Sequence, residues 1–108
     1  PGAVRLLLLD DIDRGLHIAA QARLIDVLRK LLAARPDLQI VCTTHSPYLL
    51  SRCAPEEVRV MALDAERHTR VQRLVDHPRF EEVRYGFQTG EIWASFGEDW
   101  VIGDTPDA

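Results

Sequence analysis

The 108-residue sequence is poor in cysteine, has no dense run of basic residues and contains no long apolar segment. Its two cysteines, Cys42 and Cys53, cannot build a disulfide framework, which favours a reducing compartment and hence a cytoplasmic protein. A formal net charge of −4 argues against a nucleic-acid groove formed by this segment alone. No apolar run approaches membrane-spanning length, so we expect no membrane partner. Because the chain starts at Pro1, we expect a fragment of a longer polypeptide or a processed product.

The first half of the sequence has a strand–helix–strand pattern. Residues 4–9 are almost continuously apolar, which is typical of a strand covered on both faces. Residues 18–34 predict a helix, because apolar side chains recur along one stripe at Leu24, Val27, Leu28 and Leu31. Residues 38–43 are rich in β-branched side chains and predict a second strand. Two strands joined by a helix indicate a parallel pair with a right-handed connection, and therefore an α/β fold.

Shorter elements are expected after the second strand. Ser46 and Pro47 are typical of the N-cap and the first residue of a short helix that reaches about residue 52. Residues 58–63 and 69–74 predict the two strands of a β-hairpin, because a polar loop separates them. We therefore expect a hairpin and short helices after the parallel pair.

The end of the chain predicts a short helix at residues 80–85, whereas residues 89–96 are ambiguous and fit a helix only by their apolar spacing. Four apolar side chains in and after the second segment would share one helical face, namely Ile92, Trp93, Phe96 and Trp100. We expect this face to pack onto the sheet. The alternative is a contact surface for a partner protein, because tryptophan with an acidic rim recurs at interfaces.

Two adjacent carboxylates, Asp10 and Asp11, follow the first predicted strand. Open parallel sheets bind ligands at the carboxyl ends of their strands. At such a position one carboxylate can hold a hydrated Mg²⁺, while its neighbour orients or deprotonates an attacking water. The alternative interpretation is that these acids only cap the turn after the strand.

A histidine, His45, follows the second predicted strand and is flanked by three hydroxyl side chains, Thr43, Thr44 and Ser46. An imidazole at this position can donate a hydrogen bond to a phosphate oxygen or to an attacking water. The alternative is a turn histidine bonded to nearby backbone. The carboxylates and the histidine follow adjacent strands, so together they indicate a ligand site more specifically than either does alone.

Residues 6–11, residues 13–17 with Gln21, and residues 39–50 together resemble the C-terminal half of an ABC-type ATPase head. The pattern is most similar to the AAA-family ATPases of the OLD type and to their RecF and SMC relatives. The resemblance covers residues 4–63, and it implies the parallel β-α-β core of a P-loop NTPase. By this resemblance the C-terminal half of the head is expected at 1–75 and a tryptophan-containing extension at 76–108.

The resemblance also implies a role for each matched residue. Asp10 would be the Walker B aspartate that binds Mg²⁺, and Asp11 would occupy the position of the catalytic carboxylate. His45 would be the switch histidine that senses the γ-phosphate of ATP, with Ser46 beside it at the nucleotide. The D-loop, which meets a partner head across the nucleotide, would contain Asp13, Gly15 and His17.

Two positions depart from the usual pattern of these ATPases. The catalytic position usually holds glutamate, whereas this chain has Asp11, as RecF-like proteins do. The D-loop of transporters and of RecF ends in aspartate, whereas His17 stands at that position here. The Gly-Leu-His form is typical of the OLD-like group, and the alternative for His17 is an ordinary residue at the start of a helix.

The sequence has no Walker A motif, the Gly-x-x-x-x-Gly-Lys-Ser/Thr loop that cradles phosphates. Its one lysine, Lys30, lies within the first predicted helix. The signature motif of ABC-type heads, which precedes Walker B, is missing too. We therefore expect half of an ATP and Mg²⁺ site, and no useful ATP hydrolysis by this chain alone.

Three functions are compatible with the sequence. The first is the C-terminal segment of an OLD-like ATPase that couples hydrolysis to DNA handling or anti-phage defence, as a homodimer or with a companion chain that carries the P-loop. In that case nucleic acid would be reached through the parent protein. The second is a non-catalytic scaffold or interaction module derived from such an ATPase. The third is a Toprim-like metal nuclease, because residues 11–13 read Asp-x-Asp, but no glutamate precedes them.

Overall fold

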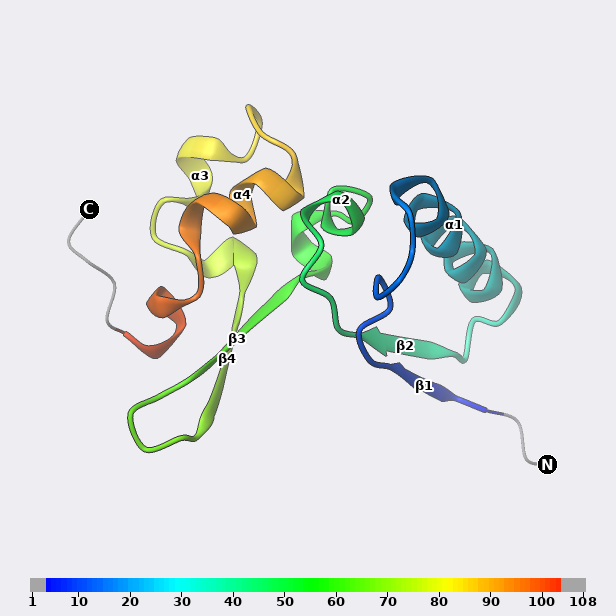
Figure 1. Cartoon of the computed structure of the whole chain (residues 1–108), viewed down its shortest axis with the longest axis horizontal. Helices are drawn as coiled ribbons and strands as arrows, with labels where there is room; N and C mark the ends of the chain where they lie inside the picture. The colour runs from blue at the N-terminus through cyan, green and yellow to red at the C-terminus, as the bar shows by residue number, and fades with distance from the viewer. Residues whose placement is uncertain (1–3, 104–108) are drawn as a thin grey trace. The chain divides into compact units, whose positions relative to one another are not determined.

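The computed structural model describes residues 4–103 of the chain (Figure 1). The chain forms two compact units, a first unit of Pro1–Arg52 and a second unit of Cys53–Ala108. The fold is mixed α/β, as the sequence predicts. The division into family segments at residue 75 stays a prediction, and the compact units divide at a different position.

The first unit contains a parallel pair of strands, β1 (Leu6–Leu9) and β2 (Gln39–Cys42), connected by the helix α1 (Ile18–Ala34). A short helix, α2 (Pro47–Leu50), follows β2. The register places Leu6 opposite Gln39 and Leu9 opposite Cys42. The predicted strand–helix–strand arrangement is therefore confirmed, and each strand is shorter than its apolar run.

The ends of the helices in this unit have local causes. The His17 Nδ1 atom accepts a hydrogen bond of 3.4 Å from the Ala19 amide at the start of α1. Pro36 lacks an amide hydrogen and follows the residue that caps the other end of α1. Ser46 caps α2, because its hydroxyl accepts a hydrogen bond of 3.2 Å from the Leu49 amide. The predicted N-cap role of Ser46 is thus confirmed.

The buried face of α1 differs from the predicted apolar stripe. Gln21 and Ile25 are the buried residues of α1, at 8% and 6% exposure. Val27 and Leu31, which belong to the predicted stripe, are exposed. The helix α1 contacts the short helix α2, and the buried Gln21 bonds to Ser46, the residue that caps α2.

One face of the parallel pair is open to solvent in the described part of the chain. Successive side chains of a strand point to opposite faces. Three of the apolar side chains on alternate positions are strongly exposed: Leu6 at 51%, Leu8 at 67% and Val41 at 47%. In Figure 1, α1 lies over one face of the pair. The expectation of a strand covered on both faces therefore does not hold within residues 4–103.

The second unit is built around an antiparallel hairpin of β3 (Arg59–Leu63) and β4 (Thr69–Arg73), as predicted. Asp64 closes the hairpin loop by accepting hydrogen bonds of 2.9 Å from the Glu66 and His68 amides. The remaining elements are short: η1 (Pro55–Glu57), η2 (Leu74–Asp76), α3 (Phe80–Val83), α4 (Thr89–Phe96) and η3 (Asp99–Ile102). The helix predicted at residues 80–85 is confirmed as α3, which ends earlier than expected, and the ambiguous segment 89–96 forms the helix α4.

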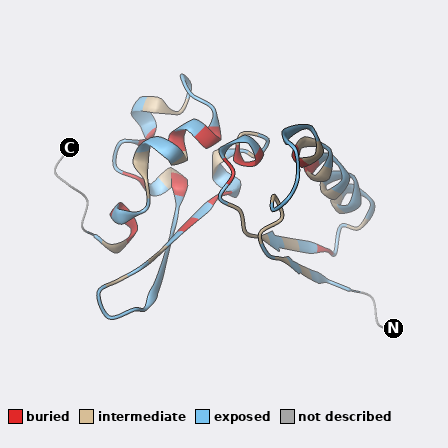
Figure 2. Cartoon of the chain, in the orientation of Figure 1, coloured by how far each residue is buried: buried red, intermediate tan, exposed pale blue. Residues whose placement is uncertain are grey.

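The core of the second unit forms where its helices and hairpin pack together (Figure 2). Its most deeply buried side chains include Leu74, Phe80 and Ile92. Trp100, at 7% exposure, lies in η3, which contacts both strands of the hairpin. The His77 ring stacks on Phe96 with centroids 3.6 Å apart. The apolar side chains at the end of the chain thus pack within this unit.

Candidate functional site

The candidate site lies in the first unit, where β1 and β2 end side by side. The loop after β1 begins with Asp10, and the loop after β2 begins with Thr43. The Thr43 amide donates a hydrogen bond of 2.9 Å to the Leu9 carbonyl, which extends the pairing by one residue. Carboxylates and hydroxyls that follow the two strands are therefore brought to the same end of the sheet, as predicted.

The first link between the two loops is made by Thr43. Its hydroxyl donates a hydrogen bond of 2.5 Å to Asp10 Oδ1 and accepts one of 2.9 Å from the Asp11 amide. The Thr43 carbonyl accepts a further hydrogen bond of 3.1 Å from the Ile12 amide. One residue of the second loop thus orients the Asp10 carboxylate and the backbone that follows it.

The second link joins Thr44 to Asp13. The Thr44 hydroxyl donates a hydrogen bond to Asp13 Oδ1 and accepts one of 3.0 Å from the Ser46 amide. This hydroxyl is the main cause of a lowered pKa for the Asp13 carboxyl group, and backbone amides and the nearby His45 act in the same direction. Partial burial opposes the shift. Asp13 is therefore held as a carboxylate that faces the second loop.

The third link is buried and joins Gln21 to Ser46, whose side chains are 8% and 7% exposed. The Ser46 hydroxyl donates a hydrogen bond of 2.6 Å to Gln21 Oε1. The three links together fix the loop after β1, the start of α1 and the loop after β2 as one assembly.

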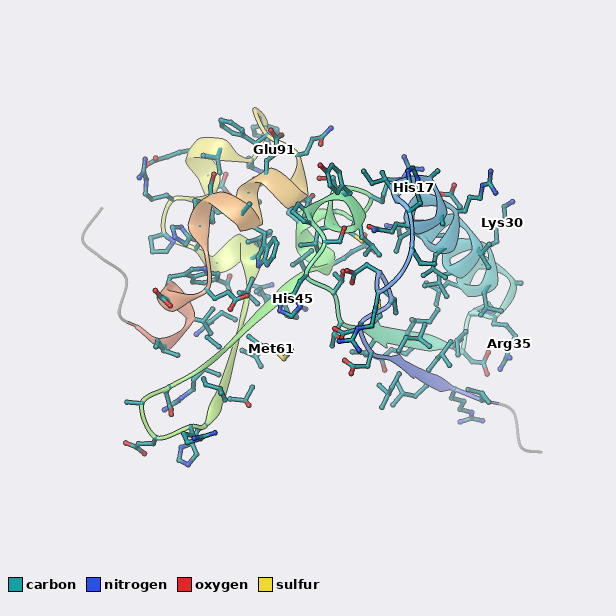
Figure 3. The ribbon with its side chains drawn as sticks, viewed as in Figure 1. His17, Lys30, Arg35, His45, Met61 and Glu91 are labelled. Atoms are coloured by element: carbon teal, nitrogen blue, oxygen red, sulfur yellow. The ribbon has the colours of Figure 1, made fainter. Side chains whose placement is uncertain are left out.

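Asp11 and His45 are the side chains that these links leave available. The Asp11 carboxylate lies 3.6 Å from the guanidinium of Arg14, which is 84% exposed. The Asp11 side chain is itself 38% exposed, so this contact leaves the carboxylate accessible. The His45 ring is exposed and makes no hydrogen bond to another residue of the described segment (Figure 3). Both groups therefore have the accessibility that a ligand contact needs.

Two of the residues assigned to the D-loop have structural roles in the loop after β1. Gly15 has a φ of +75°, in the left-handed region that glycine adopts without strain. The turn before it is closed by the Arg14 amide, which donates a hydrogen bond of 3.0 Å to the Asp11 carbonyl. His17 caps α1 through its ring nitrogen. The structural alternative for His17 is thus observed, while its role at a nucleotide stays a prediction.

The carboxylates of the site suit a magnesium ion that is shared with phosphates. Among residues 4–103, no three His, Cys, Asp or Glu side chains gather to hold a metal ion by themselves. Mg²⁺ usually keeps several waters and is held by one or two carboxylates together with substrate phosphates. Asp10 fits this requirement. Its Oδ1 atom accepts the hydrogen bond from Thr43, and the second carboxylate oxygen can bind the metal ion.

The side-chain contacts that join the two loops are not predicted by the sequence. Thr43 and Thr44 precede His45 in the sequence, and their position directly after a strand is the signal that predicts a contact at this end of the sheet. Gln21 belongs to the family pattern in the sequence, and in the structure it is one of the buried polar residues. A glutamine in the first turns of an amphipathic helix gives no sign of being buried, so its contact could not be foreseen.

Residues 1–51 match the family model described as "AAA domain, putative AbiEii toxin, Type IV TA system". This match covers nearly the whole first unit and includes all three links between the loops. The first unit is therefore similar to the ATPase domain of AAA-type proteins, and its α/β arrangement is consistent with a fragment of the P-loop NTPase fold.

The chain is also similar to the Septu protein PtuA of Bacillus thuringiensis, with 34% identity over 83 residues. The match covers 77% of this chain and 19% of that protein. Because the first unit holds residues 1–52, the match must extend into the second unit. The chain thus spans about a fifth of the length of this relative.

No helix within the described ranges has both the length and the apolar character needed to cross a bilayer.

Proposed function

We propose that this chain supplies the half of an ATPase site that binds Mg²⁺ and activates water, while a P-loop is supplied by another polypeptide segment or chain. We call the assembly of this chain and that P-loop the complete ATPase. The observation that carries the proposal is the linkage of two strand ends through Asp10 and Thr43, which leaves Asp11 and His45 accessible at one edge of the sheet. The similarity of residues 1–51 to an AAA domain supports it.

Each residue then has a role that its chemistry permits. Asp10 would hold Mg²⁺, which neutralises charge that develops on the transferred phosphate. Asp11 would orient the attacking water and accept its proton, and His45 would donate a hydrogen bond to a γ-phosphate oxygen. Ser46 would support the nucleotide end of the loop. The D-loop residues Asp13, Gly15 and His17 would face a second head across the nucleotide.

We assign the complete ATPase to the OLD-like group and to anti-phage defence, in preference to DNA repair. Two similarities support the assignment to defence: the family description names a putative toxin of a type IV system, and the chain is similar to a Septu protein. Nucleic acid would then be contacted by other parts of the complete protein, since this segment carries a net charge of −4. A homodimer of heads would complete the site.

The open face of the parallel pair supports the existence of a companion segment that covers this face in the complete ATPase. Parallel sheets occur almost only with both faces covered, whereas Leu6, Leu8 and Val41 are exposed here. A non-catalytic scaffold is the second candidate, because the sequence contains no Walker A motif and has aspartate at position 11. The two candidates differ in whether the complete ATPase turns over ATP through Asp11.

The decisive experiment measures ATP hydrolysis by the complete ATPase and by its Asp10→Ala and His45→Ala variants. We expect each substitution to lower kcat by roughly a hundred-fold or more, as removal of one stabilising group in a phosphoryl-transfer site does. Arg23→Ala, at an exposed position on α1, is the matched control and should hydrolyse ATP normally. Normal turnover by the Asp10 variant would refute the assignment, and absence of turnover by the unmodified protein would favour the scaffold.

A further inference from the structure

Gln21 is a buried polar residue that the proposed reaction does not use. It lies in α1 with 8% of its surface exposed. Burial of an amide without hydrogen bonds is unfavourable by about 1–3 kcal/mol, so its contacts explain why it can occupy this position. Both ends of the amide are bonded, one to each of the two loops that build the site.

The hydrogen bonds of Gln21 form a directed chain. The Leu49 amide donates to the Ser46 hydroxyl over 3.2 Å, and that hydroxyl donates to Gln21 Oε1 over 2.6 Å. Gln21 Nε2 then donates to the Leu16 carbonyl over 3.1 Å. The amide oxygen accepts from one neighbour and the amide nitrogen donates to another, so the orientation of the amide is fixed by its neighbours.

This chain of bonds connects the loop that carries His45 with the loop that carries Asp10 and Asp11. Ser46 directly follows His45 in the sequence, and Leu16 lies in the loop that begins with the Asp10 and Asp11 pair. The His45 ring itself makes no hydrogen bond to a described residue, so its position depends on the backbone that carries it. A displacement of Ser46 would therefore displace His45.

We infer that Gln21 is a positioning residue that holds His45 through Ser46 and couples this loop to the D-loop through the Leu16 carbonyl. The inference rests on the proposed function, because it assumes that His45 contacts the nucleotide. Gln21 itself touches no reacting group. The inference requires its effect on turnover to pass through His45, which makes the role distinguishable from a general contribution to folding.

The test compares Gln21→Met with the unmodified complete ATPase. Methionine keeps the length of the side chain but cannot form either hydrogen bond. We expect kcat to fall roughly ten- to hundred-fold with little change in the KM for Mg-ATP, since small displacements of a catalytic group have effects of that size. Gln72→Met, an exposed change of the same kind on β4, should leave both constants unaltered.

The decisive arm repeats Gln21→Met in the His45→Ala background. A positioning role predicts no further loss of kcat there, because the group being positioned is absent. An equal loss in both backgrounds would overturn the inference, as would an unchanged kcat in the single variant. If Gln21→Met does not fold, Gln21→Asn keeps an amide but is one methylene too short to reach both partners, and the same comparison applies.

The outcomes also separate this inference from the proposed function. Normal turnover in the Asp10→Ala and His45→Ala variants would refute the proposed function and the positioning role together. Loss of turnover in those variants, with unaltered turnover in Gln21→Met, would refute the positioning role alone.

Discussion

The hydroxyl of Thr43 donates a hydrogen bond of 2.5 Å to Asp10 Oδ1, across the ends of two neighbouring parallel strands. The same oxygen accepts the Asp11 amide, so one side chain orients both adjacent aspartates. This relationship exists only because β1 and β2 pair with Leu9 opposite Cys42, which places residues 10 and 43 side by side. A site divided between two loops thus obtains its geometry from strand register.

Substitution of Thr43 by valine tests this relationship, because valine has nearly the same shape without the hydroxyl. We expect Thr43→Val to be less stable by about 1 kcal/mol, the usual contribution of a hydrogen bond, and to need more Mg²⁺ for half-maximal ATP hydrolysis. Thr43→Ser keeps the hydroxyl and should behave more like the unmodified protein. A Mg²⁺ dependence that is the same in the valine and serine variants would contradict the role of this bond.

The order of elements in the first unit could be predicted from the sequence, because each signal is local. Helix α1 has the predicted bounds, since apolar periodicity and Pro36 mark its extent. The buried side of α1 could not be predicted, because it depends on which elements pack against the helix. Leu31 belongs to the apolar stripe of the sequence and is exposed, whereas the polar Gln21 is buried.

The contacts within the site were predictable only in part. The sequence placed Asp10 and His45 at the same sheet edge, because the carboxyl ends of parallel strands coincide. It could not assign Thr43 to Asp10 or Thr44 to Asp13, since these pairings depend on register and on the path of the loop. The family resemblance places Gly15 in a D-loop. Its positive φ gives a local reason for glycine at this position that the resemblance does not supply.

Protonation of His77 should destabilise the second unit in mildly acidic solution. Burial is the main cause of a pKa below the ordinary value of 6.5, and the nearby Arg79 adds to it. The unfolded chain therefore binds a proton at higher pH than the folded chain does, and the free energy of unfolding rises with pH in this window. The contribution of neutral His77 to the free energy of unfolding is fully present above pH 6.5, and it decreases as the pH falls from 6.5 towards the pKa of His77 in the folded chain.

Chemical unfolding of the unmodified protein and of His77→Gln across this pH range checks the effect. The glutamine variant should lack the component of the pH dependence that begins at pH 6.5, although the loss of the ring stacked on Phe96 lowers its stability overall. His68→Gln, at an exposed position in the hairpin loop, is the matched control and should keep that component. An unaltered pH profile in the His77 variant would contradict the assignment.

The open face of the parallel pair should be covered in the complete ATPase. Leu8 is 67% exposed in this chain, and Leu63, on the hairpin, is 59% exposed. We expect Leu8→Glu to destabilise the complete ATPase by about 2–3 kcal/mol or more, because a charge would replace a buried apolar side chain. Leu63→Glu serves as the comparison at a similarly exposed position. Equal thermal unfolding temperatures for the two variants would show that Leu8 stays in water.

Replacement of Asp11 by asparagine should separate catalysis from structure at the site. Asp11 has a φ of 49°, in the left-handed region that asparagine and aspartate adopt more readily than other residues with a side chain. Asp11→Asn should therefore fold normally and bind Mg-ATP in the complete ATPase, while its single-turnover rate of hydrolysis falls by roughly a hundred-fold or more through loss of the group that accepts the proton. Asp11→Glu restores a carboxylate at the cost of a less favourable backbone conformation, and we expect its rate to lie above that of the asparagine variant. If asparagine supported hydrolysis at the unmodified rate, Asp11 could not be the residue that activates water, and the scaffold interpretation would gain support.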